Sequence, residues 1–167
     1  MRFGKVFYII VLLICLFEIA RLWKIVPAQM AAHFDIHGNP NHFVSKAEFF
    51  WYQIQTVVIL VVISLLPQIL FLVLPVNLIN IPNRAYWLAP ERRKETVSRL
   101  SSFVALTFGI ILLAIQAAFE ISAYANLQSP ISFNAQLLFR VMLAALIIVG
   151  VLLFQLLRSF RLPASNV

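Results

Sequence analysis

The chain has 167 residues, of which 62% are hydrophobic and only 11% are charged. Soluble domains carry about 25% charged residues, so this composition excludes an ordinary soluble protein and favours a membrane protein. The formal net charge is +7, and a single cysteine, Cys15, excludes an intrachain disulfide.

Four apolar stretches divide the chain, and each is about long enough to cross a hydrocarbon core of roughly 30 Å as a helix. They are Val6 to Leu22, Phe49 to Leu74, Phe103 to Tyr124 and Leu137 to Leu157. Because they take up about half of the chain, we predict an all-α fold with one transmembrane domain over residues 1–167. This domain is a bundle of four transmembrane helices. No small-x-small cleavage site follows the first span, so we expect it to stay uncleaved.

Prolines mark where the helices bend or begin. The second span is long enough that tilting, or a kink at Pro67, would absorb the excess, and Pro75 then ends it. Ala89-Pro90-Glu91 predicts a helix start, with proline in the first turn and an acid near the positive helix end. Residues 92–100 would then extend the third span beyond the membrane.

The basic residues lie mostly on one side of these spans. Nine of the 13 Lys and Arg residues are on that side, namely Arg2, Lys5, Arg84, Arg92, Arg93, Lys94, Arg99, Arg158 and Arg161. The positive-inside rule therefore predicts that both termini and the loop over residues 75–102 are cytoplasmic, and that the loop over residues 23–48 is outside. The basic excess thus indicates topology and contact with anionic lipid at the cytoplasmic face, and not a nucleic-acid partner.

The first outer loop is rich in residues with special chemistry. Gly38-Asn39-Pro40-Asn41 predicts a turn. Before it, His33, Asp35 and His37 alternate with apolar residues, so an extended strand would place these three side chains on one face. They are candidate ligands for zinc or copper. The alternative is that His33 organises the loop through hydrogen bonds while the other two histidines of the loop are solvated.

This loop resembles a bacterial membrane domain of unknown function found at the N-terminal end of SdpI-like toxin-immunity proteins. That family shows a proline, a His-aromatic pair, a Gly-x-Pro-Asp/Asn turn, an aromatic residue and a lysine. The corresponding residues are Pro27, His33, Phe34, Gly38, Pro40, Asn41, Phe43 and Lys46. The resemblance covers the loop and the flanking parts of the first two spans, and Asn41 stands where many members have Asp. The segment from Asn83 to Arg93 is similar to a second element of short members.

The resemblance implies a multi-pass protein of the bacterial cytoplasmic membrane. In SdpI-like relatives it implies protection against a secreted toxin, with signalling through a sequestered regulator. This chain has only four predicted spans, so we expect a short member of the family that lacks the C-terminal half of the longer immunity proteins.

A second set of candidate residues lies within the spans. Ionisable groups there cost roughly 2.5 to 3.5 kcal/mol at the membrane centre, so they usually face the bundle or water. In the predicted topology a polar layer forms near the outer face from Glu18, Gln53, Gln55, Gln116, Glu120 and Arg140. We predict an ion pair between Glu120 and Arg140, while Arg21 and Lys24 either pair with Glu18 or reach the headgroups. The layer either locks the helix ends together or lines a ligand cavity.

The cytoplasmic loop combines aromatic and basic residues, Tyr86, Trp87, Arg92 and Arg93. This pattern is typical of an interfacial belt on anionic lipid, and the alternative is a docking surface for a soluble protein partner.

No motif of a soluble enzyme is present, so we do not expect an enzyme. The leading hypothesis is a small SdpI-like membrane protein that binds or senses a ligand or toxin at its outer face. One alternative is a small transporter or permease component, which should show broken helices or an inverted repeat. Another is a structural subunit of a larger membrane complex.

Overall fold

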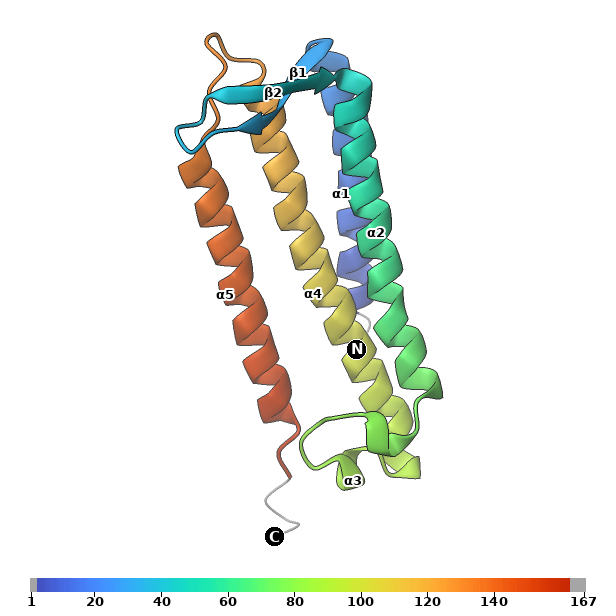
Figure 1. Cartoon of the computed structure of the whole chain (residues 1–167). Coiled ribbons are helices and arrows are strands. Elements are labelled where there is room, and N and C mark those ends of the chain that lie inside the picture. Colours follow the sequence, from blue (N-terminus) through green and yellow to red (C-terminus); the bar gives the residue numbers. More distant parts are fainter. Residues whose placement is uncertain (1–2, 163–167) are drawn as a thin grey trace.

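A computed structural model of the chain describes residues 3–162 and consists of four long helices with a β-hairpin across one end (Figure 1). The helices are α1 (Phe3–Ile25), α2 (Lys46–Val73), α4 (Pro90–Ala125) and α5 (Ala135–Ser159). All four are long and apolar enough to cross a membrane, which confirms the predicted bundle. Arg2, one of the residues used to predict topology, lies outside the described residues.

Local sequence signals explain where the helices begin and end. Ser45 caps α2: its Oγ accepts from the backbone N–H of Glu48 at 3.2 Å, and the Glu48 carboxylate accepts from the backbone N–H of Ser45 at 2.8 Å. Helix α2 continues through Pro67 and ends at Val73, shortly before Pro75. Helix α4 begins at Pro90, as predicted, and its 36 residues extend well beyond the length that a membrane requires.

Helix α4 is the centre of the bundle and packs against each of the other three long helices. Gly109 permits the close approach of α1, because a Cβ at this position would lie 2.8 Å from the Phe7 ring. Helix α5 packs on α4, and none of its residues is buried. Large apolar side chains of α5 such as Phe139 and Leu146 are 66% and 69% exposed, as expected of a helix that faces lipid.

The predicted outer loop contains the one sheet of the described residues, an antiparallel hairpin of β1 (Gln29–Phe34) and β2 (Pro40–Ser45). The predicted turn at Gly38 is confirmed, and Gly38 has a φ of +85°, which favours glycine. The predicted strand is shorter than expected, since β1 ends at Phe34 and Asp35 begins the turn. Met30, Val44, Phe49 and neighbouring apolar residues form a buried core between the hairpin and the helix ends.

The opposite end of the bundle holds the loop between α2 and α4, with the short helices η1 (Val76–Leu78) and α3 (Arg84–Trp87). Helix α1 begins and α5 ends at this same end, so the hairpin and the α3 segment lie at opposite ends of the molecule (Figure 1).

Candidate functional site

The hairpin is fastened to the bundle at several points. Lys46, the first residue of α2, donates from Nζ to the backbone oxygen of Trp23 at 2.8 Å, and its ammonium lies 5.2 Å from the centre of the Trp23 ring. At the other side Phe34 stacks on Phe133 of the second outer loop, with ring centres 4.7 Å apart. The backbone N–H of Phe133 donates to the Gly38 oxygen at 2.9 Å. These contacts fix the hairpin, residues 29–45, over this end of the bundle, where it forms a roof.

Most of the residues that carry the family resemblance lie in the hairpin or at its ends. Pro27 lies between α1 and β1, Gly38 forms the turn, and Pro40 begins β2. His33 is exposed, and its Nδ1 donates to the side-chain oxygen of Asn41 on the neighbouring strand. This contact leaves the second ring nitrogen, Nε2, without a hydrogen-bond partner among the described residues. His33 Nε2 and the exposed amide nitrogen of Asn41 are therefore polar groups of the motif that remain free at the surface among the described residues.

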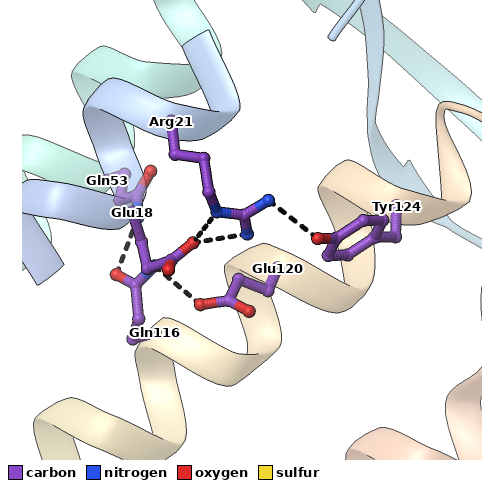
Figure 2. Close-up of polar contacts among 6 residues, drawn as sticks. All are labelled: Glu18, Arg21, Gln53, Gln116, Glu120 and Tyr124. Atoms are coloured by element: carbon purple, nitrogen blue, oxygen red, sulfur yellow. Dashed lines mark hydrogen bonds and ion pairs between the residues drawn. The ribbon is translucent and has the colours of Figure 1, made fainter. Parts of the chain in front are cut away.

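Beneath the roof, a polar cluster joins α1, α2 and α4 (Figure 2). Arg21 forms an ion pair with Glu18 one turn earlier on α1, and it also donates to the Tyr124 hydroxyl of α4 at 2.9 Å. Gln53 of α2 donates from Nε2 to Oε1 of Gln116 at 2.8 Å, and Gln116 donates to Glu120 at 3.3 Å. Gln53 and Gln116 are almost completely buried, so lipid cannot satisfy their polar groups. The bonds pair Gln53 Nε2 and both ends of the Gln116 amide, while Oε1 of Gln53 stays without a partner among the described residues.

The structure brings together some residues of the predicted polar layer and separates others. Glu18, Gln116 and Glu120 come together, but Arg140 does not join them. Arg140 is exposed on α5, and among residues 3–162 it forms no ion pair with Glu120. The predicted Glu120–Arg140 pair is therefore wrong, because α5 presents Arg140 outward, and Arg21 is the cation that enters the cluster.

Gln55 was also placed in this layer, and this prediction is wrong. Its side chain is exposed, whereas Gln53, two residues earlier, is fully buried and contacts α4. The physical reason is helical periodicity: two residues along a helix correspond to a rotation of about 200°, so both side chains cannot face the bundle.

The predicted metal ligands do not form a site. The carboxylate of Asp35 accepts from the backbone N–H groups of His37 and Asn39, both at 2.8 Å, so it stabilises the hairpin turn. These hydrogen bonds lower the pKa of Asp35, with the Asn39 backbone N–H as the main cause. Within residues 3–162 no group of three His, Cys, Asp or Glu side chains is arranged to hold a metal ion. His33 lies on β1 and is bound to Asn41, away from the turn.

Among the cavities at the hairpin end, two are lined by residues that the sequence singled out. One, of about 440 Å³, lies between α4 and α5 and is lined by Glu120 and Tyr124 together with Ser132 and Asn134 of the second outer loop. The other, of about 310 Å³, lies under the hairpin and is lined by His33 and by the aromatic residues Phe49, Phe119 and Phe133. The first cavity therefore offers a carboxylate, and the second offers aromatic surface beside an imidazole.

Glu120 differs from Glu18 in its electrostatic surroundings. Glu18 is neutralised by Arg21, whereas in the described part of the chain no Lys or Arg lies within ion-pairing distance of Glu120. A carboxylate that borders a cavity without a cation is suited to bind a positively charged group.

The predicted lipid- or partner-binding residues at the other end make contacts within the protein. Trp87 donates from Nε1 to the backbone oxygen of Phe160 at 2.9 Å, and Arg93 donates to the Leu74 oxygen at 2.8 Å. The Arg92 guanidinium lies 4.0 Å from the centre of the Tyr86 ring. Trp87 therefore links α3 to the end of α5, Arg93 links α4 to the end of α2, and Arg92 packs on Tyr86 between α3 and α4, roles that the sequence did not reveal.

One functional position was missed entirely. Asn126, at the end of α4, is buried and forms two hydrogen bonds with the backbone of Ala31 in β1. In the sequence, Asn126 is recognisable only as an amide residue at the end of an apolar span.

Residues 9–56 match the model of a domain of unknown function, DUF1648. The matched segment runs from α1 through the hairpin into α2, so it contains the roof, Glu18, Arg21 and Gln53, but neither α4 nor α5. No curated protein and no solved structure matches the chain. The comparisons thus support a membrane-type protein with a domain of unknown function in its N-terminal third.

Proposed function

We propose that this protein is a small SdpI-like membrane protein of the immunity or signalling class, which binds a ligand at its hairpin end. In this proposal the hairpin end faces the outside of a bacterial cell and both termini are cytoplasmic. The charge distribution supports this orientation, because eight of the 12 Lys and Arg residues in the described part of the chain lie at the opposite end.

The observation that carries the proposal is the position of Glu120. Its carboxylate borders a cavity of about 440 Å³ between α4 and α5, directly below the second outer loop, and no Lys or Arg of the described chain forms an ion pair with it. A negative charge near hydrocarbon is costly, so an amine or guanidinium that enters from outside would gain a charge-assisted hydrogen bond. We therefore expect a ligand with a cationic group, such as a basic side chain of a secreted peptide toxin.

The surroundings of Glu120 are built to hold it in place. Gln116 donates to its carboxylate at 3.3 Å and is itself held by Gln53 of α2. Tyr124, one turn further along α4, lines the same cavity and is fixed by Arg21. The carboxylate is thus supported from two helices before any ligand arrives, which lowers the entropic cost of binding.

The continuity of the helices favours binding over transport. Transporter sites typically use helices broken near the membrane midplane. In the part of the chain that the structure describes, α2 continues through Pro67 and the other three spans are uninterrupted.

The experiment compares variants in toxin-sensitive bacteria that express the protein. Cells with the wild-type protein should survive the secreted toxin, and Glu120→Gln should reduce protection by about tenfold or more, since hydrogen bonds to charged groups contribute roughly 1.5 to 3 kcal/mol. The matched control is Glu95→Gln, because Glu95 is an exposed carboxylate paired with Arg99 at the other end of the bundle.

Membrane levels of each variant are measured by immunoblot, and the location of the N-terminus by reporter fusion. Equal protection by wild type and Glu120→Gln would contradict the assigned site. A complete lack of protection by the wild-type protein would contradict the immunity role, and a reporter that places the N-terminus outside would contradict the orientation.

A further inference from the structure

The end of the bundle opposite the hairpin contains a crevice of about 610 Å³. It lies between the beginning of α1, the end of α2 and the first turns of α4. Its volume is within the range of about 300 to 1,000 Å³ that is usual for small-molecule sites. The crevice is separate from the cavities at the hairpin end, and the inference drawn from it does not depend on the proposed function.

The polar part of the crevice is positively charged. Lys5 of α1 and Arg93 and Lys94 of α4 line it, and no Asp or Glu is among its lining residues. The acids nearby on α4 are engaged elsewhere: Glu91 pairs with Arg92 at 3.1 Å, and Glu95 pairs with Arg99 at 3.3 Å. Three cations of the crevice thus share one site without a carboxylate to neutralise them.

The three cations differ in whether a group of the protein already binds them. Arg93 donates to the Leu74 backbone oxygen at 2.8 Å, which holds its guanidinium at the crevice. Lys5 and Lys94 are exposed, and within residues 3–162 neither ammonium forms a hydrogen bond or ion pair. The first turn of α4 also borders the crevice through Pro90, so the positive end of the helix dipole adds to the attraction for an anion.

The remaining wall is apolar and belongs to the membrane-spanning part of the molecule. Leu65 and Ile69 of α2 and Val97 of α4 line it, and the two α2 residues lie within a helix that is long and apolar enough to cross the membrane. A free phosphate ion would contact only the charged edge. A molecule with a phosphate at one end and a hydrocarbon chain at the other would match both parts of the crevice.

We propose that this crevice is a specific binding site for one anionic phospholipid. Lys5, Arg93 and Lys94 hold the phosphate of the headgroup, and an acyl chain lies along Leu65, Ile69 and Val97. Basic pockets between transmembrane helices at the cytoplasmic side are a general form of lipid recognition. The bound lipid would link the ends of α1, α2 and α4, and so stabilise the end of the bundle that lacks the hairpin.

The test uses native mass spectrometry of the purified full-length protein, titrated with dioleoyl-phosphatidylglycerol or dioleoyl-phosphatidylcholine. The variant is Lys5→Gln combined with Lys94→Gln. The control is Arg158→Gln combined with Arg161→Gln, which removes the same charge from the same end but outside the crevice. Since a basic residue near the lipid surface contributes about fivefold in affinity, the variant should bind phosphatidylglycerol about 25-fold more weakly than wild type. The control should lose clearly less affinity than the variant, because neither Arg158 nor Arg161 lines the crevice.

Three outcomes would overturn the proposal. They are equal binding of the two lipids by wild type, an equal loss in variant and control, and release of the lipid by millimolar glycerol phosphate, which would identify the site as one for free phosphate. Circular dichroism checks that the variant folds. As an independent measurement on the wild-type protein, a photoactivatable phosphatidylglycerol should label residues 65–71 or 90–98, and labelling confined to α5 would contradict the proposed position.

Discussion

The side chain of Asn126, at the end of α4, forms hydrogen bonds with both the N–H and the carbonyl oxygen of Ala31 in β1. Its Oδ1 accepts from the Ala31 N–H at 2.6 Å, and its Nδ2 donates to the Ala31 oxygen at 3.0 Å. Both residues are buried, so water does not compete for these groups. This side chain therefore holds the first hairpin strand on the central helix of the bundle, in addition to the contacts of Lys46, Phe34 and Gly38.

Replacement of Asn126 by alanine should release the hairpin from α4. The variant leaves the Ala31 N–H and oxygen without these partners in a buried place, which costs about 1 to 3 kcal/mol. We expect a lower thermal stability in detergent and faster amide exchange over residues 29–45, with unchanged exchange in α5. The control is Asn77→Ala, whose side chain is exposed. Unchanged exchange in the hairpin of Asn126→Ala would contradict the anchoring role.

Replacement of Gly38 by alanine should separate the hairpin from the second outer loop. Gly38 has a φ of +85°, and a Cβ there would overlap the backbone oxygen of Phe133. The turn must therefore shift, and the hydrogen bond from Phe133 to Gly38 and the stacking of Phe34 on Phe133 should weaken. Amide exchange of residues 130–135 measures this change.

The matched control for this variant is Gly150→Ala. Nothing lies within 4 Å of a Cβ at Gly150, which is inside α5, so alanine should be neutral or stabilise the helix by up to about 1 kcal/mol. Equal exchange in the two variants would show that the turn tolerates a side chain at position 38.

The sequence predicted the spans and the turn because both depend on local chemistry. Hydropathy sets the length of a span, Pro90 sets the start of α4, and Gly38 permits the turn. The rotation of each helix about its axis was harder to predict. The rule that ionisable residues within spans face the bundle predicts that Arg140 points inward, whereas the structure leaves it exposed on α5.

The contacts of the loops could not be predicted for a different reason. Asn126 binds the backbone of a residue 95 positions earlier, and a backbone group carries no sequence signal. Trp87 likewise binds the backbone oxygen of Phe160, so an aromatic residue that resembled a membrane belt is a structural contact. Such pairings depend on the completed packing of distant segments.

Double-mutant cycles should show that Arg21, and not Arg140, forms an ion pair at the hairpin end. Arg21 and Glu18 form an ion pair, so alanine substitutions at these positions should be coupled by about 0.5 to 3 kcal/mol. Arg140 and Glu120 form no pair, so their effects should add within about 0.5 kcal/mol. Stability is measured by reversible unfolding in mixed detergent. Strong coupling of Arg140 with Glu120 would show that the ion pair predicted from the sequence does form.

Replacement of the two buried glutamines should show whether they act as a pair. Gln116→Leu alone leaves the Gln53 amide without its acceptor, and we expect a loss of about 1 kcal/mol, a usual size for hydrogen bonds between membrane helices. The double variant with Gln53→Leu removes both amides and should recover the part of this loss that comes from the unpaired Gln53 amide, but not the hydrogen bond that Gln116 donates to Glu120. Gln55→Leu is the control, because Gln55 is exposed. A double variant less stable than the single one would indicate that packing, and not hydrogen bonding, determines this contact.

The hairpin turn should open only in acid. Hydrogen bonds to the carboxylate of Asp35, first from the Asn39 backbone N–H, lower its pKa in the folded protein from the ordinary value of 3.8. Since the folded pKa is the lower one, the carboxylate contributes its full stabilisation above pH 3.8 and loses it as the pH falls through the folded pKa. We expect carbon-13 NMR in micelles to give a pKa below 3.8 for this carboxyl group, and turn protection to stay constant from about pH 5 to 8. Asp35→Ala should remove the acid transition. A pKa at or above the ordinary value would mean that the Asn39 and His37 N–H groups do not bind the carboxylate in solution.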